Sequence, residues 1–525
     1  MTGLRFRDAA AGALNTRVSG AGNAVMAGKR LYLAVGACAV VVYLGALWNR
    51  FALDDSPVLA LNPLVHAPSG VWRAFGAPYF PANLDASAYR PVAVATYALD
   101  WLVGSTAWFH AVNLAWHGGA SVLVAVLARR WAGGAAALVA GTLFAVHPVH
   151  VEAVANVVGR NELMAAVFTL LAVYAALERG SVLWSAAAMA AGVLSKENGA
   201  VAPGLVAAAW LLGVRPVPPR RKLAMFVGSW LALAVAYLGL RSYVLHGFLG
   251  AGNVAPVFLA QDGLTIRLTA IAALGDVARL LLFPLALSAD YSPDHRTAVR
   301  GLLDARLAAG VLVLSLWALL LGWALQRGRR VEAFGLAWIP IAYAPVANLL
   351  FPTQILIAER TLYLPSAGLS IALGAALRGL SGRRLGAAAA LVLLLGGLRT
   401  ALRVPVWRDD SALALALLRD APQSYFSWSN IGWQHLWSGR FARAIEAFRV
   451  SSEIYPRDAR VYIAAAHAAY AEHRPELADS LVTKADGVCD RCVTYYYNQA
   501  WFARFRGDSS AADSLVARAR RLRPS

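Results

Sequence analysis

Long apolar stretches recur from residue 31 to residue 402 of this chain and constrain its fold more than any other feature. A helix needs about 20 mostly apolar residues to cross the hydrocarbon core of a membrane. Hydrophobic residues make up 59% of the 525 residues and charged residues only 15%, whereas soluble domains carry about 25% charged residues. The mean hydropathy of +0.54 agrees with this apolar composition. The sequence therefore excludes a soluble enzyme and predicts an all-α fold, with a polytopic membrane helix bundle.

The apolar runs predict about eleven transmembrane helices in a membrane domain at 31–404, after a cytoplasmic tail at 1–30. The first outer loop would cover 51–104. The predicted spans lie near 31–48, 106–128, 133–149, 162–177, 181–195, 199–214, 223–245, 307–326, 332–350, 361–379 and 384–402.

One further apolar stretch, at 266–288, contains the charged residues Arg267, Asp276 and Arg279. Charges at membrane depth are costly. We therefore interpret this stretch as an interfacial or re-entrant helix within an outer loop at 246–302.

Basic residues gather in alternate loops, which indicates the orientation of the bundle. With a cytoplasmic N-terminus, the inner loops carry Arg129, Arg130, Arg179, Arg215, Arg220, Arg221, Lys222, Arg327, Arg329, Arg330, Arg378, Arg383 and Arg384. This topology places the C-terminus outside the cytoplasm. It also accounts for the net charge of +19 without nucleic-acid binding.

The segment at 420–525 shows a different pattern, with a period of 34 residues. Trp428, Ile431, Gly432, Ala444, Phe448 and Pro456 match the spacing of a tetratricopeptide repeat. The small residue at 432 returns at 466 and 500, the alanine at 444 returns at 478 and 512, and the proline at 456 returns at 524. We predict three repeats forming an extracytoplasmic α-solenoid. Its groove would bind an extended peptide, or the repeats would simply cap the membrane domain.

Cys489 and Cys492 form a C-x-x-C pattern within the repeats. Outside the cytoplasm this spacing is compatible with a local disulfide or with two free thiols. Cys38 lies in the first apolar run and is expected to be an ordinary buried residue.

Six polar clusters fall on the outer side in this topology. They contain Asp54 and Asp55; Arg90; His147, His150, Glu152, Arg160 and Glu162; Lys196 and Glu197; Asp290; and Glu359 and Arg360. The adjacent carboxylates could supply a general base or cap a helix. Arg90 could clamp a phosphate or extend to the membrane surface. Lys196 could balance a phosphate or pair with a glutamate.

The run from His147 to Glu152 has a spacing that could suggest a metal site, but it offers no closed ligand set. We predict a polar bridge lining a sugar or phosphate cavity, and no metal. Polar loops at one end of an apolar bundle indicate a substrate with an apolar tail and a polar head. A lipid-phosphate-linked donor fits this description, and no Walker A or G-x-G-x-x-G motif points to nucleotide chemistry.

Four segments give the chain a specific resemblance. LFAVHPVHVEAVANVVGRNELMAA, LSKENG, LSADYS and AERTLYLPSAG strongly resemble the transmembrane and tetratricopeptide-repeat-containing (TMTC) protein O-mannosyltransferase family of the GT-C superfamily. The resemblance spans about residues 31–380, and the C-terminal repeats match the same layout. The Ala/Gly/Arg-rich composition suggests a bacterial homologue in the inner membrane, with periplasmic repeats.

The resemblance implies transfer of mannose from a polyprenyl-phosphate donor to Ser/Thr hydroxyls of extracytoplasmic proteins, with inversion. It matches Asp54 and Asp55 to the acidic pair of the GT-C first outer loop. Arg160, Lys196 and Arg360 are then candidates for the lipid phosphate. Glu152 and Glu162 would bind sugar hydroxyls or pair with those cations. The lipid-phosphate sugar is a co-substrate, and no cofactor is implied.

Two alternatives remain open at this stage. One is a GT-C transferase with another lipid-linked sugar or a glycolipid acceptor. The other is a non-catalytic membrane-anchored scaffold that recruits partners through its repeats. The outer carboxylates and cations favour an enzyme, because a scaffold has no use for them.

Overall fold

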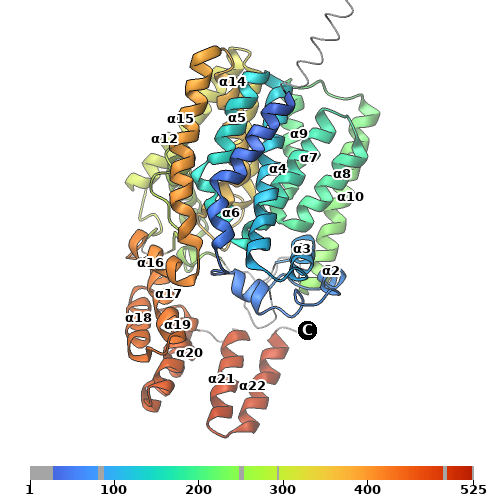
Figure 1. The fold of residues 1–525 in the computed structure, drawn as a ribbon. Helices are drawn as coiled ribbons and strands as arrows, with labels where there is room; N and C mark the ends of the chain where they lie inside the picture. The colour runs from blue at the N-terminus through green and yellow to red at the C-terminus, as the bar shows by residue number, and fades with distance from the viewer. Residues whose placement is uncertain (1–27, 81–87, 248–253, 293–294, 489–492, 523–525) are drawn as a thin grey trace, which may run out of the picture.

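The computed structural model describes residues 28–80, 88–247, 254–292, 295–488 and 493–522, and every regular element in these ranges is a helix. Figure 1 shows a bundle of long helices with a smaller group of helix pairs attached at one end. The all-α prediction is confirmed. Most of the predicted tail, the cysteine pair Cys489 and Cys492, and Pro524 lie outside the described residues.

Each predicted span is helical. The bundle consists of a helix at 28–42, α4 (Thr106–Ala132), α5 (Gly134–Val146), α7 (Arg160–Leu177), α8 (Val182–Ser195), α9 (Ala202–Leu211), α10 (Arg220–Leu245), α12 (Ala305–Gln326), α13 (Arg330–Tyr343), α14 (Tyr363–Ala376) and α15 (Gly382–Arg403). Some are shorter than predicted. The predicted span 199–214, for example, begins within η6 (Glu197–Val201), and α9 covers only part of it.

Among the described residues, five helices are long and apolar enough to cross a membrane, or six if a bent pair counts as one span. The bent pair joins α5 to Pro148–Ala155 at an angle of 46°. These helices make the chain a multi-pass membrane protein. The count of eleven spans stays a prediction, since the remaining helices are shorter.

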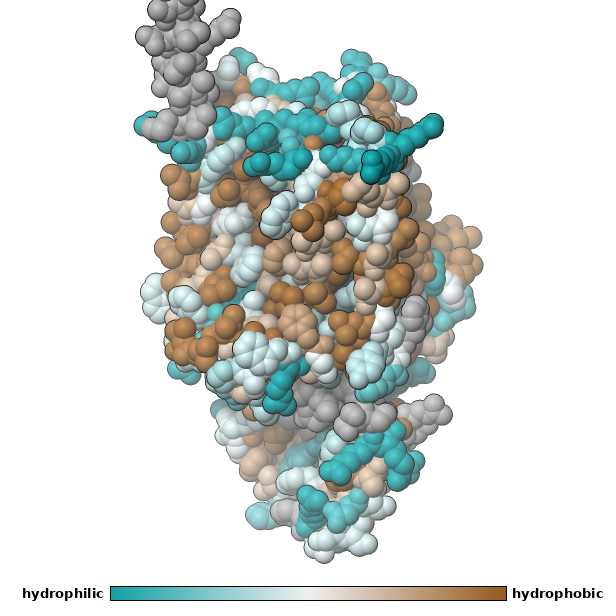
Figure 2. Space-filling view, turned by 90° about the vertical axis from the view of Figure 1, so that its right-hand side faces the viewer, coloured by the Kyte–Doolittle hydropathy of each residue, from teal (hydrophilic) through white to brown (hydrophobic). Residues whose placement is uncertain are grey.

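The two ends of the bundle differ in charge. The basic loops predicted to face inward meet at one end, where Arg215 lies 2.9 Å from Glu178 and Arg378 lies 2.7 Å from Glu332. Figure 2 shows a hydrophilic band at this end and a mostly hydrophobic surface below it. The loops predicted to face outward and the repeats lie at the opposite end (Figure 1), which we call the site end. The sidedness of these ends in the membrane stays a prediction.

The apolar stretch predicted to lie at the interface forms α11 (Gly263–Leu282). The Leu281 carbonyl near its C-terminus accepts a hydrogen bond of 2.9 Å from His147, and Arg267 near its N-terminus donates to the Leu350 carbonyl. Its Asp276 pairs with Arg296 at 2.7 Å. Both ends of α11 thus contact connecting segments of the bundle, and its Asp276 and Arg279 are paired, which is compatible with an interfacial or re-entrant helix.

The repeats confirm the predicted solenoid. They consist of the helix pairs α17 (Tyr425–Trp437) and α18 (Phe441–Ile454), α19 (Ala459–Ala471) and α20 (Pro475–Val488), and α21 (Val493–Phe505) and α22 (Ser509–Leu522). Corresponding helices begin 34 residues apart, as the sequence period requires. The recurring alanines at 444, 478 and 512 are fully buried between the helices. α16 (Asp410–Asp420) connects the bundle to the first repeat.

Helices α13 and α14 pack at very short distance where Gly335 faces Gly368. A β-carbon at either glycine would lie 2.6 Å from the carbonyl oxygen of the other. Backbone carbonyls cannot move aside as a flexible side chain can, so this crossing requires glycine on both helices.

We therefore expect Gly335→Leu to force α13 and α14 apart and to lower the free energy of unfolding by about 1–3 kcal/mol. Thermal unfolding in detergent would measure the change. Gly322→Leu is the matched control, because a β-carbon at Gly322 in α12 would meet nothing within 4 Å. Equal melting temperatures for both variants would contradict the close crossing.

Candidate active site

The first outer loop turns sharply just before its two carboxylates. Leu53 has φ +55, a left-handed conformation that costs a leucine about 1 kcal/mol or more. The Leu53 N–H donates a 2.7 Å hydrogen bond to Asp410 at the start of α16. This bond helps to hold the turn and presents Asp54 and Asp55 in different directions.

Asp55 is fully buried and points into the protein. Its carboxylate accepts hydrogen bonds from the backbone N–H groups of Ala52 at 3.2 Å, Val157 at 3.3 Å and Val158 at 2.8 Å. Burial raises the pKa of Asp55 to about 7, although these N–H groups oppose the shift. Asp55 therefore acts as a positioning residue that ties the first outer loop to η5 (Val157–Gly159).

Asp54 is half-buried, and its carboxylate has no hydrogen-bond or ion-pair partner among the described residues. It lies close to positive charge from elsewhere in the sequence. Burial lowers the pKa of Arg360, but the carboxylates of Glu152, Asp54 and Glu162 outweigh this and raise it. Of the adjacent carboxylates, Asp54 is thus the one available to a substrate.

Three cations surround this region, and each is paired with a carboxylate from a distant segment. Arg90 lies 3.2 Å from Glu197. Lys196 forms an ion pair with Glu162, and Arg360 with Glu152. We call Arg90, Lys196 and Arg360 the cation cluster.

The members of the cation cluster are close to one another. Burial lowers the pKa of Lys196, the charge of Glu162 opposes this, and the charges of Arg90 and Arg360 lower it further. The side chains of Arg90, Lys196 and Arg360 are 18%, 11% and 24% exposed. They are therefore partly desolvated yet reachable, as a site for a phosphate requires.

Tyr79 and Asn161 extend the site, and neither was among the predicted site residues. The guanidinium carbon of Arg90 lies 5.0 Å from the centre of the Tyr79 ring, and Asn161 donates a 2.8 Å hydrogen bond to the Tyr79 hydroxyl. The Oδ1 atom of Asn161 is buried without a partner among the described residues. The only available signal was the position of Asn161 between two candidate residues, Arg160 and Glu162.

Comparison with known proteins finds several relatives, and those described below are all named protein O-mannosyl-transferases. The chain is 29% identical to the protein O-mannosyl-transferase TMTC4 of Mus musculus over 487 residues, which covers 79% of this chain and 65% of that protein. It is 25% identical to the protein O-mannosyl-transferase TMTC3 of Homo sapiens over 478 residues, covering 82% and 52%. It is 32% identical to the protein O-mannosyl-transferase Tmtc2 of Drosophila melanogaster over 296 residues, covering 51% and 31%.

The chain is thus similar, over most of its length, to proteins named as members of the TMTC family. It spans less than two thirds of the length of these relatives. No protein-family model matches it, and no solved structure matches it at a significant level.

Arg160 is bound by residues of the bundle interior, and its role as a phosphate ligand stays a prediction. The side chain is fully buried and forms an ion pair with Asp100. It also donates hydrogen bonds to Asn113 at 2.8 Å and to the Phe109 carbonyl at 2.9 Å. Its charge holds α7 against α4 and α3 (Pro91–Trp101) because Asp100 compensates for the loss of water.

His147 and His150 also belong to the interior rather than to the site. Besides its bond to α11, His147 accepts a hydrogen bond from the Val149 N–H at the start of η4 (Pro148–His150). His150 is hydrogen-bonded to Ser366 at 2.7 Å and packs against Tyr363. They stabilise the break after α5, and their role as donor-binding residues stays a prediction. Among the described residues, no group of three or more His, Cys, Asp or Glu side chains could hold a metal ion.

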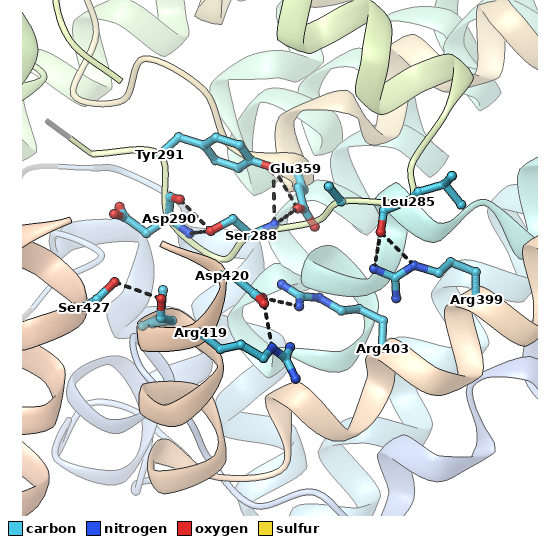
Figure 3. A network of polar contacts seen from close by, with 12 residues as sticks. Leu285, Ser288, Asp290, Tyr291, Glu359, Arg399, Arg403, Arg419, Asp420 and Ser427 are labelled. Atoms are coloured by element: carbon cyan, nitrogen blue, oxygen red, sulfur yellow. Dashed lines mark hydrogen bonds and ion pairs between the residues drawn. The ribbon is translucent and has the colours of Figure 1, made fainter. Parts of the chain in front are cut away.

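Glu359 and Asp290 form a separate network near the repeats (Figure 3). Glu359 is buried and accepts hydrogen bonds from the Ser288 N–H at 2.6 Å and the Tyr291 hydroxyl at 3.0 Å. Asp290 accepts a 2.7 Å bond from Ser424 at the start of α17. Both residues were predicted to bind the donor, but their contacts instead join the LSADYS segment to the bundle and to the repeats.

Arg160→Gln is expected to lower the free energy of unfolding by about 3–5 kcal/mol, because it leaves the buried Asp100 carboxylate without its counter-charge. Thermal unfolding in detergent measures this, and adding Asp100→Asn should recover part of the loss. Arg384→Gln, on an exposed residue at the opposite end, is the control. If Arg160→Gln melted like the parent chain, the structural assignment would fail.

Glu359 makes stability depend on pH. Burial raises its pKa to about 8 in the folded chain, against about 4.3 in an unfolded chain. The folded state therefore binds the proton of the Glu359 carboxyl more tightly than the unfolded state does. The stability that this carboxyl contributes is complete below its pKa in the unfolded chain and is lost as pH rises through about 8.

Glu359→Gln keeps an acceptor oxygen but cannot ionise. We expect its melting temperature to fall less steeply than that of the parent chain as pH rises from about 6 to about 9, a window that brackets the folded pKa. Some slope should remain, because burial also raises the pKa of Asp55 to about 7. Parallel curves for the two proteins would show that Glu359 is already ionised at neutral pH.

Proposed function

We propose that the chain is a membrane glycosyltransferase that moves mannose from a polyprenyl-phosphate donor to Ser or Thr hydroxyls of proteins. One observation carries the proposal. The Asp54 carboxylate, which has no hydrogen-bond or ion-pair partner among the described residues, lies at the site end together with the partly exposed cation cluster. The relatives whose printed names say protein O-mannosyl-transferase support the same reaction class.

In the proposed reaction, the Asp54 carboxylate accepts the proton of the acceptor hydroxyl. The hydroxyl oxygen forms a new bond to the anomeric carbon as the bond from that carbon to the phosphate oxygen breaks. The electron pair leaves with the lipid phosphate on the opposite face, so the configuration at the anomeric carbon inverts. A general base of this kind contributes about 10²–10⁴-fold to a rate.

The cation cluster would stabilise the leaving phosphate. The donor is a phosphodiester, and the product is a phosphomonoester, so negative charge grows on the phosphate during the reaction. Arg90, Lys196 and Arg360 are fixed before the substrate arrives by Glu197, Glu162 and Glu152. Because these cationic side chains are already held in place, they need little reorganisation as negative charge develops on the phosphate. Groups fixed in this way lower the activation barrier.

Asn161 and Tyr79 are suited to the sugar rather than to the phosphate. Asn161 offers a buried amide oxygen without a partner, which could accept a hydrogen bond from a sugar hydroxyl. A buried polar atom left unpaired costs about 1–3 kcal/mol. We therefore expect Asn161→Ala to weaken discrimination between sugars more than it weakens binding of the lipid phosphate.

The acceptor protein would approach from the repeat side. The three helix pairs follow directly from α16, whose Asp410 also holds the turn before Asp54. A peptide held along the repeats would thus be tethered close to the site. We place this end outside the cytoplasm on the distribution of basic residues. We place the chain in a bacterial inner membrane on its Ala/Gly/Arg-rich composition.

The test is an in vitro transfer assay with the purified chain, polyprenyl-phosphate mannose and a Ser/Thr-rich peptide mixture. Asp54→Asn is expected to lower the transfer rate by about 10²-fold or more, because an amide cannot accept the proton. The melting temperature should stay unchanged, since no partner is lost. Mass spectrometry would detect the mannosylated peptide, and NMR of the product linkage would test inversion.

Asp262→Asn is the matched control. Asp262 is an exposed carboxylate on the outer loop that caps α11, and asparagine caps a helix about as well. Unchanged transfer by Asp54→Asn would remove Asp54 as the base. Donor binding without transfer would favour another sugar or a glycolipid acceptor, and no donor binding at all would favour the scaffold alternative.

A further inference from the structure

A pocket of about 310 Å³ lies where the end of α15 meets α16, separate from the cation cluster. Its polar lining consists of Arg399, Arg403, Arg419 and Asp420, and its apolar lining includes Leu285 and Leu402. Figure 3 shows that the three guanidinium groups lie near one another, with Arg399 directed toward Leu285 and the other two toward Asp420.

The pocket carries more positive charge than its own residues neutralise. Asp420 accepts hydrogen bonds from both Arg403 at 2.6 Å and Arg419 at 2.9 Å. Among the described residues, Arg399 donates only to the Leu285 carbonyl, at 2.8 and 3.1 Å. Among the lining residues, one carboxylate faces three guanidinium groups. The buried Glu359 lies outside the lining and also acts on Arg399 and Arg403.

Arg403 also lacks acceptors. It is 3% exposed, and its Nε and Nη2 atoms are buried without a hydrogen-bond partner among the described residues. Leaving buried donors of a charged group unsatisfied is costly, and native structures rarely do so without reason. An anion with several acceptor oxygens in this pocket would satisfy them.

An apolar surface runs along α15 into the pocket. Leu395, Leu398 and Leu402 are 61%, 55% and 67% exposed, and their spacing places them on one side of the helix. On the membrane-facing surface of a spanning helix, these side chains would contact lipid chains. A lipid lying along them would bring its headgroup to Arg399 and Arg403.

We propose that this pocket binds the phosphate headgroup of an anionic membrane phospholipid, with its acyl chains along the leucines of α15. Arginine binds phosphate through paired N–H donors, which fits three converging guanidinium groups. A zwitterionic headgroup fits poorly, because the only carboxylate in the lining already has two partners. The bound lipid would link α15 to α16 and hold the repeats at the membrane surface. This proposal does not depend on the transferase activity.

The test uses the full chain in detergent, titrated with phosphatidylglycerol or phosphatidylcholine and followed by native mass spectrometry. We expect one phosphatidylglycerol to bind in preference to phosphatidylcholine. The double variant Arg399→Gln/Arg419→Gln should bind it at least about tenfold more weakly, which corresponds to about 1.4 kcal/mol. Arg408→Gln is the matched control, because Arg408 is 61% exposed nearby and pairs with Asp409 outside the pocket.

Each other outcome overturns the proposal. Equal binding of the two phospholipids would exclude selection for an anionic headgroup. Unchanged binding by the double variant, at an unchanged melting temperature, would place the lipid elsewhere. Displacement by inorganic phosphate at similar concentrations would assign the pocket to a soluble anion. If the double variant proved unstable, Arg403→Lys would replace it, since lysine keeps the charge but loses the paired donors.

Discussion

A charge withdrawn from water must be compensated, and this requirement organises the whole site end of the bundle. Arg90, Lys196, Arg360 and Arg160 each meet a carboxylate from a segment far away in the sequence. Breaking one such pair would leave a desolvated charge, which costs much more than the pair itself contributes. The pairs therefore act as constraints: the loops can fold back among the helices only in an arrangement that satisfies all of them.

The same requirement separates the adjacent carboxylates. Asp55 is compensated by three backbone N–H groups, whereas Asp54 has no partner among the described residues. The strained conformation at Leu53 produces this division, because it turns the chain between a buried and an accessible position. Strain next to an unpartnered carboxylate is typical of functional sites, where the surrounding structure holds the unfavourable conformation.

Hydrogen bonds connect the repeat region to the site end, in addition to the chain itself. Asp410 of α16 accepts the hydrogen bond from the strained turn, and Ser424 of α17 binds Asp290. The connecting helix α16 thus contacts the first outer loop, and the start of the first repeat contacts the LSADYS segment. Binding of a ligand to the repeats, or of a lipid at the junction, would therefore be coupled to the segments that position the site.

Much of the fold could be predicted because it depends on local patterns. Apolar runs of helical length gave the bundle helices, although some lengths were overestimated, as at 199–214, where α9 covers only Ala202–Leu211. The spacing of small residues gave the repeats in register, because a residue larger than Gly432 would clash with Phe448 in the paired helix. Four motifs gave the resemblance to the TMTC family, since the residues within each motif are adjacent in the sequence.

The candidate site could be predicted only as a list of residues. Arg160 and Arg360 look alike in sequence, yet one is fully buried against Asp100 and the other is partly exposed beside Glu152. By itself, the sequence determined the helices, the charge asymmetry and the repeat period, which follow from hydropathy and spacing along the chain. Only the tertiary structure decided which charges are accessible, because burial and pairing depend on segments that meet after folding.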